Sequence, residues 1–166
     1  MENMGVLGKV VDYLLLLSFF SITLTAQLDI PESILPHAYN PFYQVYTTLT
    51  QDYLVLEQPA FFKALMTLEL VYQLPLALLN IYGLLYSKPW FNTTCLLFGA
   101  SIVASTAAMV GDILNSQKAS ANLMAMYYPP FLPLGVLAIV RGVVGQSSKA
   151  APSIGNGPSS AVKKRA

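Results

Sequence analysis

The feature that most constrains this chain is a set of apolar runs, each long enough to cross a bilayer as a helix. One crossing takes about 20 mostly apolar residues, and four windows qualify. They extend from Lys9 to Ala26, Ala64 to Tyr86, Cys95 to Leu114 and Leu123 to Val144. Only 10% of the 166 residues are charged, against about 25% in soluble domains. The sequence therefore predicts an all-α bundle of four transmembrane helices.

The segments outside these spans differ in composition. The long loop between the first and second spans is acidic and carries Asp29, Glu32, Asp52 and Glu57. Residues 146–166 are rich in Ser, Gly, Pro and Ala, so they cannot bury enough apolar area to order themselves. We therefore expect one membrane domain over residues 1–145 and a disordered tail over residues 146–166.

The distribution of basic residues predicts the orientation, because short cytoplasmic loops carry an excess of Lys and Arg. Most basic side chains lie on the side of the two termini and the second connection: Lys9, Lys88, Arg141, Lys149, Lys163, Lys164 and Arg165. Both termini are therefore predicted to be cytoplasmic. Asp12 interrupts the first apolar run, which argues against a cleaved signal peptide. Lys163 and Lys164 lie four and three places from the C-terminus, where they match a dilysine signal for return to the endoplasmic reticulum.

Glu69 is the most informative residue, because ionisable side chains at membrane depth are costly and usually mark function. Glu69, Gln73 and Asn80 are spaced i, i+4 and i+11, which places them within about 40° of one another on an α-helix. They are predicted to form one polar stripe. The alternative role of such a stripe is to hold helices together through interhelical hydrogen bonds.

The third span repeats this spacing with Ser101, Ser105 and Asp112. We expect the two stripes to face each other. Small residues, Gly99 and Gly111 among them, would let helix backbones approach closely there.

Prolines interrupt the second and fourth spans at Pro75, Pro129, Pro130 and Pro133. A proline removes a backbone hydrogen bond, and this is tolerated where the freed carbonyl is buried in protein or faces a cavity. Bent helices around a pocket are therefore predicted, with Tyr127 and Tyr128 at a depth comparable to Glu69. An aromatic-lined pocket with a buried carboxyl group suits a lipophilic amine, a carbocation-like ligand or a sterol hydroxyl.

Two segments resemble the signature of the sigma-2 receptor family within the EXPERA-domain group. They are Gln58-Pro59-Ala60-Phe61-Phe62-Lys63 and Glu69-Leu70-Val71-Tyr72-Gln73-Leu74-Pro75. Lys88-Pro89-Trp90 and Tyr127-Tyr128-Pro129 follow in the family's order. The resemblance implies a four-helix protein of the endoplasmic reticulum, related to a sterol Δ8-Δ7 isomerase, whose cavity binds sterols and cationic amphiphiles. It also makes a homodimer plausible.

The resemblance further implies a set of ligand-binding residues. Glu69 matches the family's buried glutamate, Gln73 the glutamine one turn later, Ser105 or Thr106 a threonine of the third helix, and Tyr127 a tyrosine of the fourth. The family's second acid falls on Gln27 when counted from Ile22-Thr23-Leu24, and on Asp29 when counted back from Leu35-Pro36. We favour Asp29, because Pro31 would end the helix just after it.

Three functions compete. The first is a receptor-like protein that binds sterols, membrane lipids or lipophilic amines and acts with sterol-handling membrane proteins. The second is a sterol isomerase, and the third a ligand-free scaffold or chaperone. We rank the isomerase lower, because the single histidine, His37, lies in the acidic loop. No catalytic residue, cofactor or metal is predicted, and a net charge of +1 argues against nucleic-acid binding.

Overall fold

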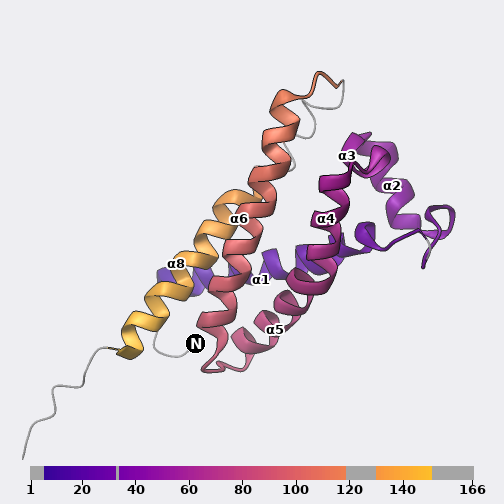
Figure 1. The fold of residues 1–166 in the computed structure, drawn as a ribbon. Helices are drawn as coiled ribbons and strands as arrows, with labels where there is room; N and C mark the ends of the chain where they lie inside the picture. Colours follow the sequence, from indigo (N-terminus) through magenta and orange to yellow (C-terminus); the bar gives the residue numbers. More distant parts are fainter. Residues whose placement is uncertain (1–5, 33, 119–129, 151–166) are drawn as a thin grey trace, which may run out of the picture.

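The computed structural model describes residues 6–32, 34–118 and 130–150, and within these ranges the chain is all-α and has no strand (Figure 1). The long helices are α1 (Val6–Thr25), α4 (Ala60–Leu68) continuing into α5 (Leu74–Leu85), α6 (Phe91–Asn115) and α8 (Phe131–Ala150). Two shorter helices, α2 (Pro41–Thr50) and α3 (Tyr53–Glu57), lie between α1 and α4. A 3₁₀ turn, Ala26–Asp29, extends α1, and another, His37–Tyr39, precedes α2.

Within the described part of the chain, three helical segments are long and apolar enough to cross a membrane: Val6–Asp29, Ala60–Leu85 and Phe91–Asn115. Phe131–Gln146 is a shorter apolar helix. The predicted spans therefore correspond to helices in the observed order, and the chain is a multi-pass membrane protein. The predicted fourth span begins at Leu123, and residues 123–129 lie outside the described part.

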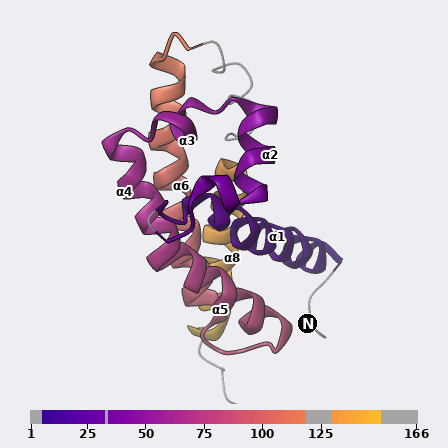
Figure 2. The same ribbon diagram turned by 90° about the vertical axis from the view of Figure 1, so that its right-hand side faces the viewer.

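The helices α6 and α8 form the tightest pair of the bundle, antiparallel and side by side (Figures 1 and 2). A Cβ atom at Gly99 would lie 2.6 Å from the carbonyl oxygen of Gly135, so the approach requires glycine. The helix α1 packs on α5 and α8, and Phe19 of α1 meets Phe98 of α6 edge to face at 5.0 Å between ring centroids. These contacts make an apolar core in which Phe19 and Phe98 are almost fully buried.

A cap made of residues 37–57 lies over one end of the bundle (Figure 1). Asn40 begins α2 by accepting a hydrogen bond from the Tyr43 amide, and its side-chain nitrogen donates to the carbonyl of Gln27 at 3.0 Å. Asp52 begins α3 in the same way by accepting from the Leu54 amide. These N-caps satisfy helix-end donors. The cap therefore has its own local structure and is joined directly to the end of α1.

Two polar contacts join the cap to α6 and to the residues after it. The Tyr53 hydroxyl donates to Asp112 of α6 at 2.6 Å, and Lys118 pairs with Glu57. A second apolar cluster, separate from the bundle core, fills the space beneath α3 and includes Leu54, Val55 and Ile113. The pocket described next lies between these two clusters.

Candidate ligand pocket

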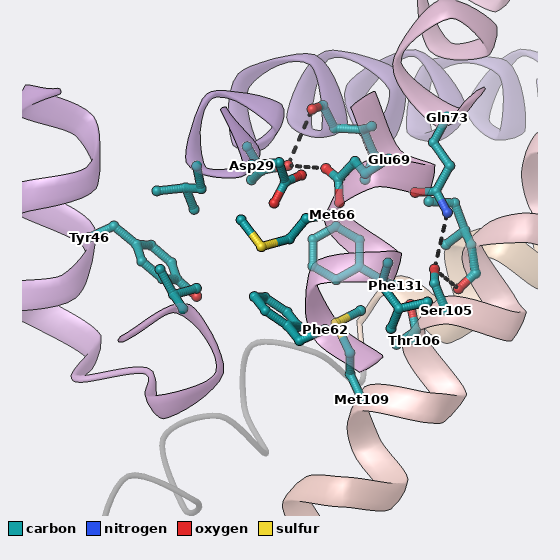
Figure 3. A pocket seen from close by; sticks show the side chains of 16 residues that line it. Asp29, Tyr46, Phe62, Met66, Glu69, Gln73, Ser105, Thr106, Met109 and Phe131 are labelled. Carbon is teal, nitrogen blue, oxygen red and sulfur yellow. Dashed lines mark hydrogen bonds between the residues drawn. The ribbon is translucent and has the colours of Figure 1, made fainter. Parts of the chain in front are cut away.

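A cavity of about 140 Å³ opens between the end of α1, the α4–α5 junction, α6, the start of α8 and the cap. Most of its wall is apolar, with Phe62, Met66, Met109 and Phe131 among the lining side chains (Figure 3). The polar side chains on the wall, apart from Tyr46, are Thr25, Asp29, Glu69, Gln73, Ser105 and Thr106. Two carboxyl groups thus lie at one end of a mostly apolar pocket.

Glu69 is the first residue of a π turn, Glu69–Gln73, that separates α4 from α5. In this turn the Leu74 amide bonds to the carbonyl of Glu69, five residues back. The following residue, Pro75, has no amide hydrogen and would clash with the carbonyl four residues before it in a regular α-helix. The wider turn accommodates the proline, and π turns of this kind occur often at functional sites. Glu69 is partly buried and faces the pocket.

Asp29 ends the 3₁₀ turn that extends α1, two residues before Pro31. Its side chain is 8% exposed, is in hydrogen-bonding contact with Glu69, and lies beside it in Figure 3. Gln27 is exposed and does not line the pocket. Of the two candidates for the second acid position, the structure thus brings Asp29 to Glu69 and leaves Gln27 outside.

The Asp29–Glu69 pair leaves capacity for a further partner. The Oδ2 atom of Asp29 is buried and has no hydrogen-bond partner among the described residues, whereas Oε1 of Glu69 accepts a hydrogen bond from the Thr25 hydroxyl at 3.3 Å. No Lys, Arg or His of the described part lines the pocket. Two carboxylates in contact repel each other when both are ionised, so the pair either shares a proton or meets a cation.

Gln73 and Asn80 lie further along the same helical segment and are satisfied by α6. The side-chain nitrogen of Gln73 donates to the hydroxyls of Ser101 at 2.9 Å and Ser105 at 3.2 Å. The carbonyl oxygen of Asn80 accepts from the Thr94 hydroxyl at 2.6 Å. The predicted facing of the two stripes is therefore confirmed at Gln73. The stripes separate at the end that holds Glu69 and Asp112, because Glu69 turns to α1 and Asp112 bonds to Tyr53.

Ser105 and Thr106 both line the pocket from α6 and are buried. The Ser105 hydroxyl donates to backbone carbonyls of its own helix and accepts from Gln73. Thr106 is 2% exposed and lies next to Ser105 on the α6 wall of the pocket (Figure 3). The two candidates for the threonine position are thus neighbours on the same wall, and Thr106 is the one whose hydroxyl is not used by Gln73.

Three of the predicted functional residues lie outside the described part of the chain: Tyr127, Lys163 and Lys164. Conversely, sequence reasoning did not select Thr25, which hydrogen-bonds Glu69. It also passed over Tyr46 of the cap, whose hydroxyl donates to Asp52 at 2.8 Å. A threonine near the end of an apolar run is too common in membrane helices to be singled out, and Tyr46 reaches the pocket only through the fold of the cap.

The fold and the pocket define a class: a helical multi-pass membrane protein with an acid-lined cavity between its helices. Residues 38–142 match the EXPERA family, the EXPanded EBP superfamily. The chain belongs to this family. It is also similar to the sigma intracellular receptor 2 of Xenopus tropicalis, with 23% identity over 154 residues, which cover 82% of this chain and 90% of the relative. No solved structure matches the chain significantly.

Proposed function

We propose that this protein binds sterols and lipophilic amines in the pocket and acts in sterol homeostasis or trafficking. The observation that carries the proposal is the buried Oδ2 of Asp29, which has no hydrogen-bond partner among the described residues and lies beside Glu69 at the end of a mostly apolar cavity. A buried polar atom that lacks a partner costs about 1–3 kcal/mol. A ligand that donates a hydrogen bond there would recover that cost.

A protonated amine suits the acid end of the pocket. An ammonium group near Asp29 and Glu69 would neutralise their mutual repulsion and donate hydrogen bonds to both carboxyl groups. The apolar part of the same ligand would then contact Phe62 and Phe131. Aromatic rings in the pocket would also attract its cationic head. The pocket therefore favours a cationic head joined to an apolar body.

A sterol would use the same site with its hydroxyl group as the polar head. The volume of about 140 Å³ is close to that of a cavity that holds a single benzene ring, about 150 Å³. A steroid nucleus therefore requires the wall to move. Met66 and Met109 belong to the wall, and methionine side chains rearrange readily because they are unbranched. Sterol binding is expected to displace them.

The endoplasmic reticulum is the proposed location, with both termini in the cytoplasm. The support is the dilysine pattern at Lys163 and Lys164 and the bias of basic residues toward that side. Sterol-handling membrane proteins and a second copy of the chain are the proposed partners. Removal of the last four residues should redistribute a tagged protein to later compartments, as seen by fluorescence microscopy.

Ligand binding to purified full-length protein tests the pocket. We expect Glu69→Gln and Asp29→Asn each to weaken binding of a tritiated lipophilic tertiary amine by about tenfold or more, the effect of one lost hydrogen bond to a charged group. Glu32→Gln is the matched control, because Glu32 is an exposed acid of the neighbouring loop. Unchanged affinity in both pocket variants would refute the proposal.

The isomerase is the second candidate, supported by the family and by the two acids in contact. One carboxylic acid would protonate the sterol alkene, and the other, as a carboxylate, would remove a proton from the adjacent carbon, so that only the double bond moves. His37 supplies no further base, because it does not line the pocket. It lies in the cap, where its ring stacks on that of Tyr43 with 3.9 Å between ring centroids. Incubation with a Δ8-sterol distinguishes the two functions, since an isomerised product would show that the protein is an enzyme and not only a binding protein. A ligand-free scaffold predicts that Glu69 is dispensable.

A further inference from the structure

A second buried charged cluster lies away from the pocket and joins three helices. Arg141 of α8 donates from Nε to Asp12 of α1 at 2.9 Å and from Nη1 to the side-chain oxygen of Asn92 of α6 at 3.0 Å. Asp12 is 2% exposed and Asn92 8%. None of the three residues lines the pocket. Arg141 is one of the basic residues from which the cytoplasmic side was predicted. In the structure its charge is neutralised inside the bundle.

The surroundings of the cluster hold it in one arrangement. A Cβ atom at Gly145 of α8 would lie 2.5 Å from the amide group of Asn92, so Asn92 occupies space that a glycine leaves open. The guanidinium group of Arg141 lies over the ring of Phe91, 5.4 Å from its centroid. Such a cluster cannot shift along α6 or α8 without losing these contacts.

The position of α1 along the bundle needs a polar contact of this kind. In a membrane, apolar helix faces contact lipid tails about as favourably as they contact another helix, so apolar packing alone specifies register weakly. A buried charge pair specifies it strongly, because a shift would leave both charges without a partner. Fixing register is the best-attested role of buried polar groups.

The same helix carries part of the pocket at its other end. Asp12 and Asp29 belong to one continuous helical segment, Val6–Asp29, and are separated along it by roughly 25 Å at 1.5 Å per residue. Thr25 and Asp29 meet Glu69 only at the present register. A slip of one turn, about 5.4 Å, would carry both residues away from Glu69.

We propose that Asp12, Arg141 and Asn92 are positioning residues, which fix the register of α1 and thereby bring Asp29 and Thr25 to Glu69. The inference rests on the proposed function, because its effect is read through ligand binding at the acid pair. Its physical content is an ion pair at one end of a rigid helix that sets the geometry of the ligand site at the other end.

Saturation binding of the tritiated amine to purified full-length protein separates positioning from a merely structural role. Loss of folded protein lowers the number of binding sites and leaves the Kd of the remaining sites unchanged, whereas a shifted register raises the Kd. We expect Asp12→Asn to raise the Kd about tenfold or more, the effect of one lost charged hydrogen bond in the pocket. Lys63→Gln, at an exposed position, is the control and should leave the Kd unchanged.

The exchanged pair Asp12→Arg with Arg141→Asp is the decisive variant, because it restores the attraction with the charges reversed. We expect it to lower the Kd again relative to Asp12→Asn. A Kd that stays as high as in the single variant overturns the inference. So does a wild-type Kd in Asp12→Asn, with or without fewer sites. Should Asp12→Asn yield no folded protein, Asn92→Ala, which keeps both charges, is judged by the same Kd criterion.

The Glu69→Gln background distinguishes this inference from the proposed function. If positioning acts through the acid pair, Asp12→Asn should raise the Kd much less in that background than in the wild type. Equal effects in both backgrounds would overturn the positioning role. Failure of Glu69→Gln and Asp29→Asn to affect binding would instead refute the proposed function itself.

Discussion

Two buried acidic sites of this protein are Asp12 and the Asp29–Glu69 pair. They differ in whether a cationic side chain of the described part pairs with the acid. At Asp12, the guanidinium group of Arg141 from another helix satisfies the carboxylate and also bonds to the side chain of Asn92, and Asp12 does not line the ligand pocket. At Asp29, the nearest ionisable group is another acid, Glu69, and the pair faces a cavity with no cationic residue on its described wall. Among the described residues, Asp12 therefore meets a cation, whereas the Asp29–Glu69 pair meets none on the pocket wall.

The contrast shows how a membrane protein can use the same residue type for two purposes. Taking a charge out of water is costly, so an acid that serves architecture is paired within the chain. Under the proposed function, an acid pair that meets no cation among the described residues of the pocket wall receives its partner from a ligand. The predictions below test whether the two clusters differ in this way.

Arg141→Met should have the largest effect on stability. It leaves Asp12 buried without its counter-ion, and breaking a buried pair by removing one partner costs about 3–5 kcal/mol. Thermal unfolding in detergent measures the loss. Glu69→Gln serves as the contrast and should cost far less, since it removes a charge that has no cation beside it. Equal losses in the two variants would abolish the distinction.

Tyr53→Phe tests a third acid, Asp112, which accepts a hydrogen bond from the neutral hydroxyl of Tyr53. Loss of this hydrogen bond should lower stability by about 1.5–3 kcal/mol, because the acceptor is a partly buried carboxyl group. Burial and the hydrogen bond to Asp112 raise the pKa of Tyr53 to about 12. The folded state therefore holds the phenol proton more tightly than the unfolded state.

The contribution of Tyr53 should accordingly be complete below pH 10 and decline as the pH rises from about 10 toward 12. Ultraviolet titration of the tyrosines should show one group fewer titrating near pH 12 in Tyr53→Phe. Tyr39→Phe is the control, because Tyr39 is 78% exposed. A wild-type titration curve in Tyr53→Phe would contradict the assignment.

Gly99→Ala should destabilise the close-packed α6–α8 pair by about 1–3 kcal/mol, the usual cost of overpacking. Gly111→Ala on the same helix is a matched control, because a Cβ atom there meets nothing within 4 Å. It should raise the unfolding temperature slightly, because alanine is favoured over glycine inside a helix by up to about 1 kcal/mol. A similar loss in both variants would show that helix α6 itself, not its contact with α8, determines the effect.

Asp29→Asn should change the stability of the unliganded protein least, within about 0.5 kcal/mol or toward greater stability, since it removes like-charge repulsion. The effect of Asp29→Asn should appear when the lipophilic amine is added and the unfolding temperature is measured again. Ligand binding raises the unfolding temperature of the wild type, and this rise should shrink in Asp29→Asn. An undiminished rise would place the ligand elsewhere.

The helices were predictable because the apolar runs leave few alternatives to crossing a membrane. Glu69 was predictable because a carboxyl group at membrane depth is conspicuous in one sequence. The position of Pro31 favoured Asp29 over Gln27. The contact of Asp29 with Glu69 still needed the fold, since Gln27 and Asp29 lie within one short 3₁₀ turn whose facing depends on the end of α1. Tyr127 stays a prediction.

The pairing of Asp12 with Arg141 was not predicted. The two residues are 129 positions apart, and a one-dimensional pattern contains no signal for their meeting. Asp12 was visible only as a break in an apolar run. The separation of Glu69 from the rest of its stripe was also not predicted, because the spacing i, i+4 and i+11 places the three residues on one face only in a regular α-helix, and a π turn begins at Glu69.

The π turn at Glu69–Gln73 bears on how relatives of this chain should be aligned. A π turn holds one residue more than the α-helical turn it replaces, and it begins and ends within the same helix. A homologue with a regular helix here would lack one residue in the middle of a membrane span. Single-residue gaps, normally forbidden inside such spans, are physically permitted at this point. Alignments that refuse them would misassign residues on one side of Glu69.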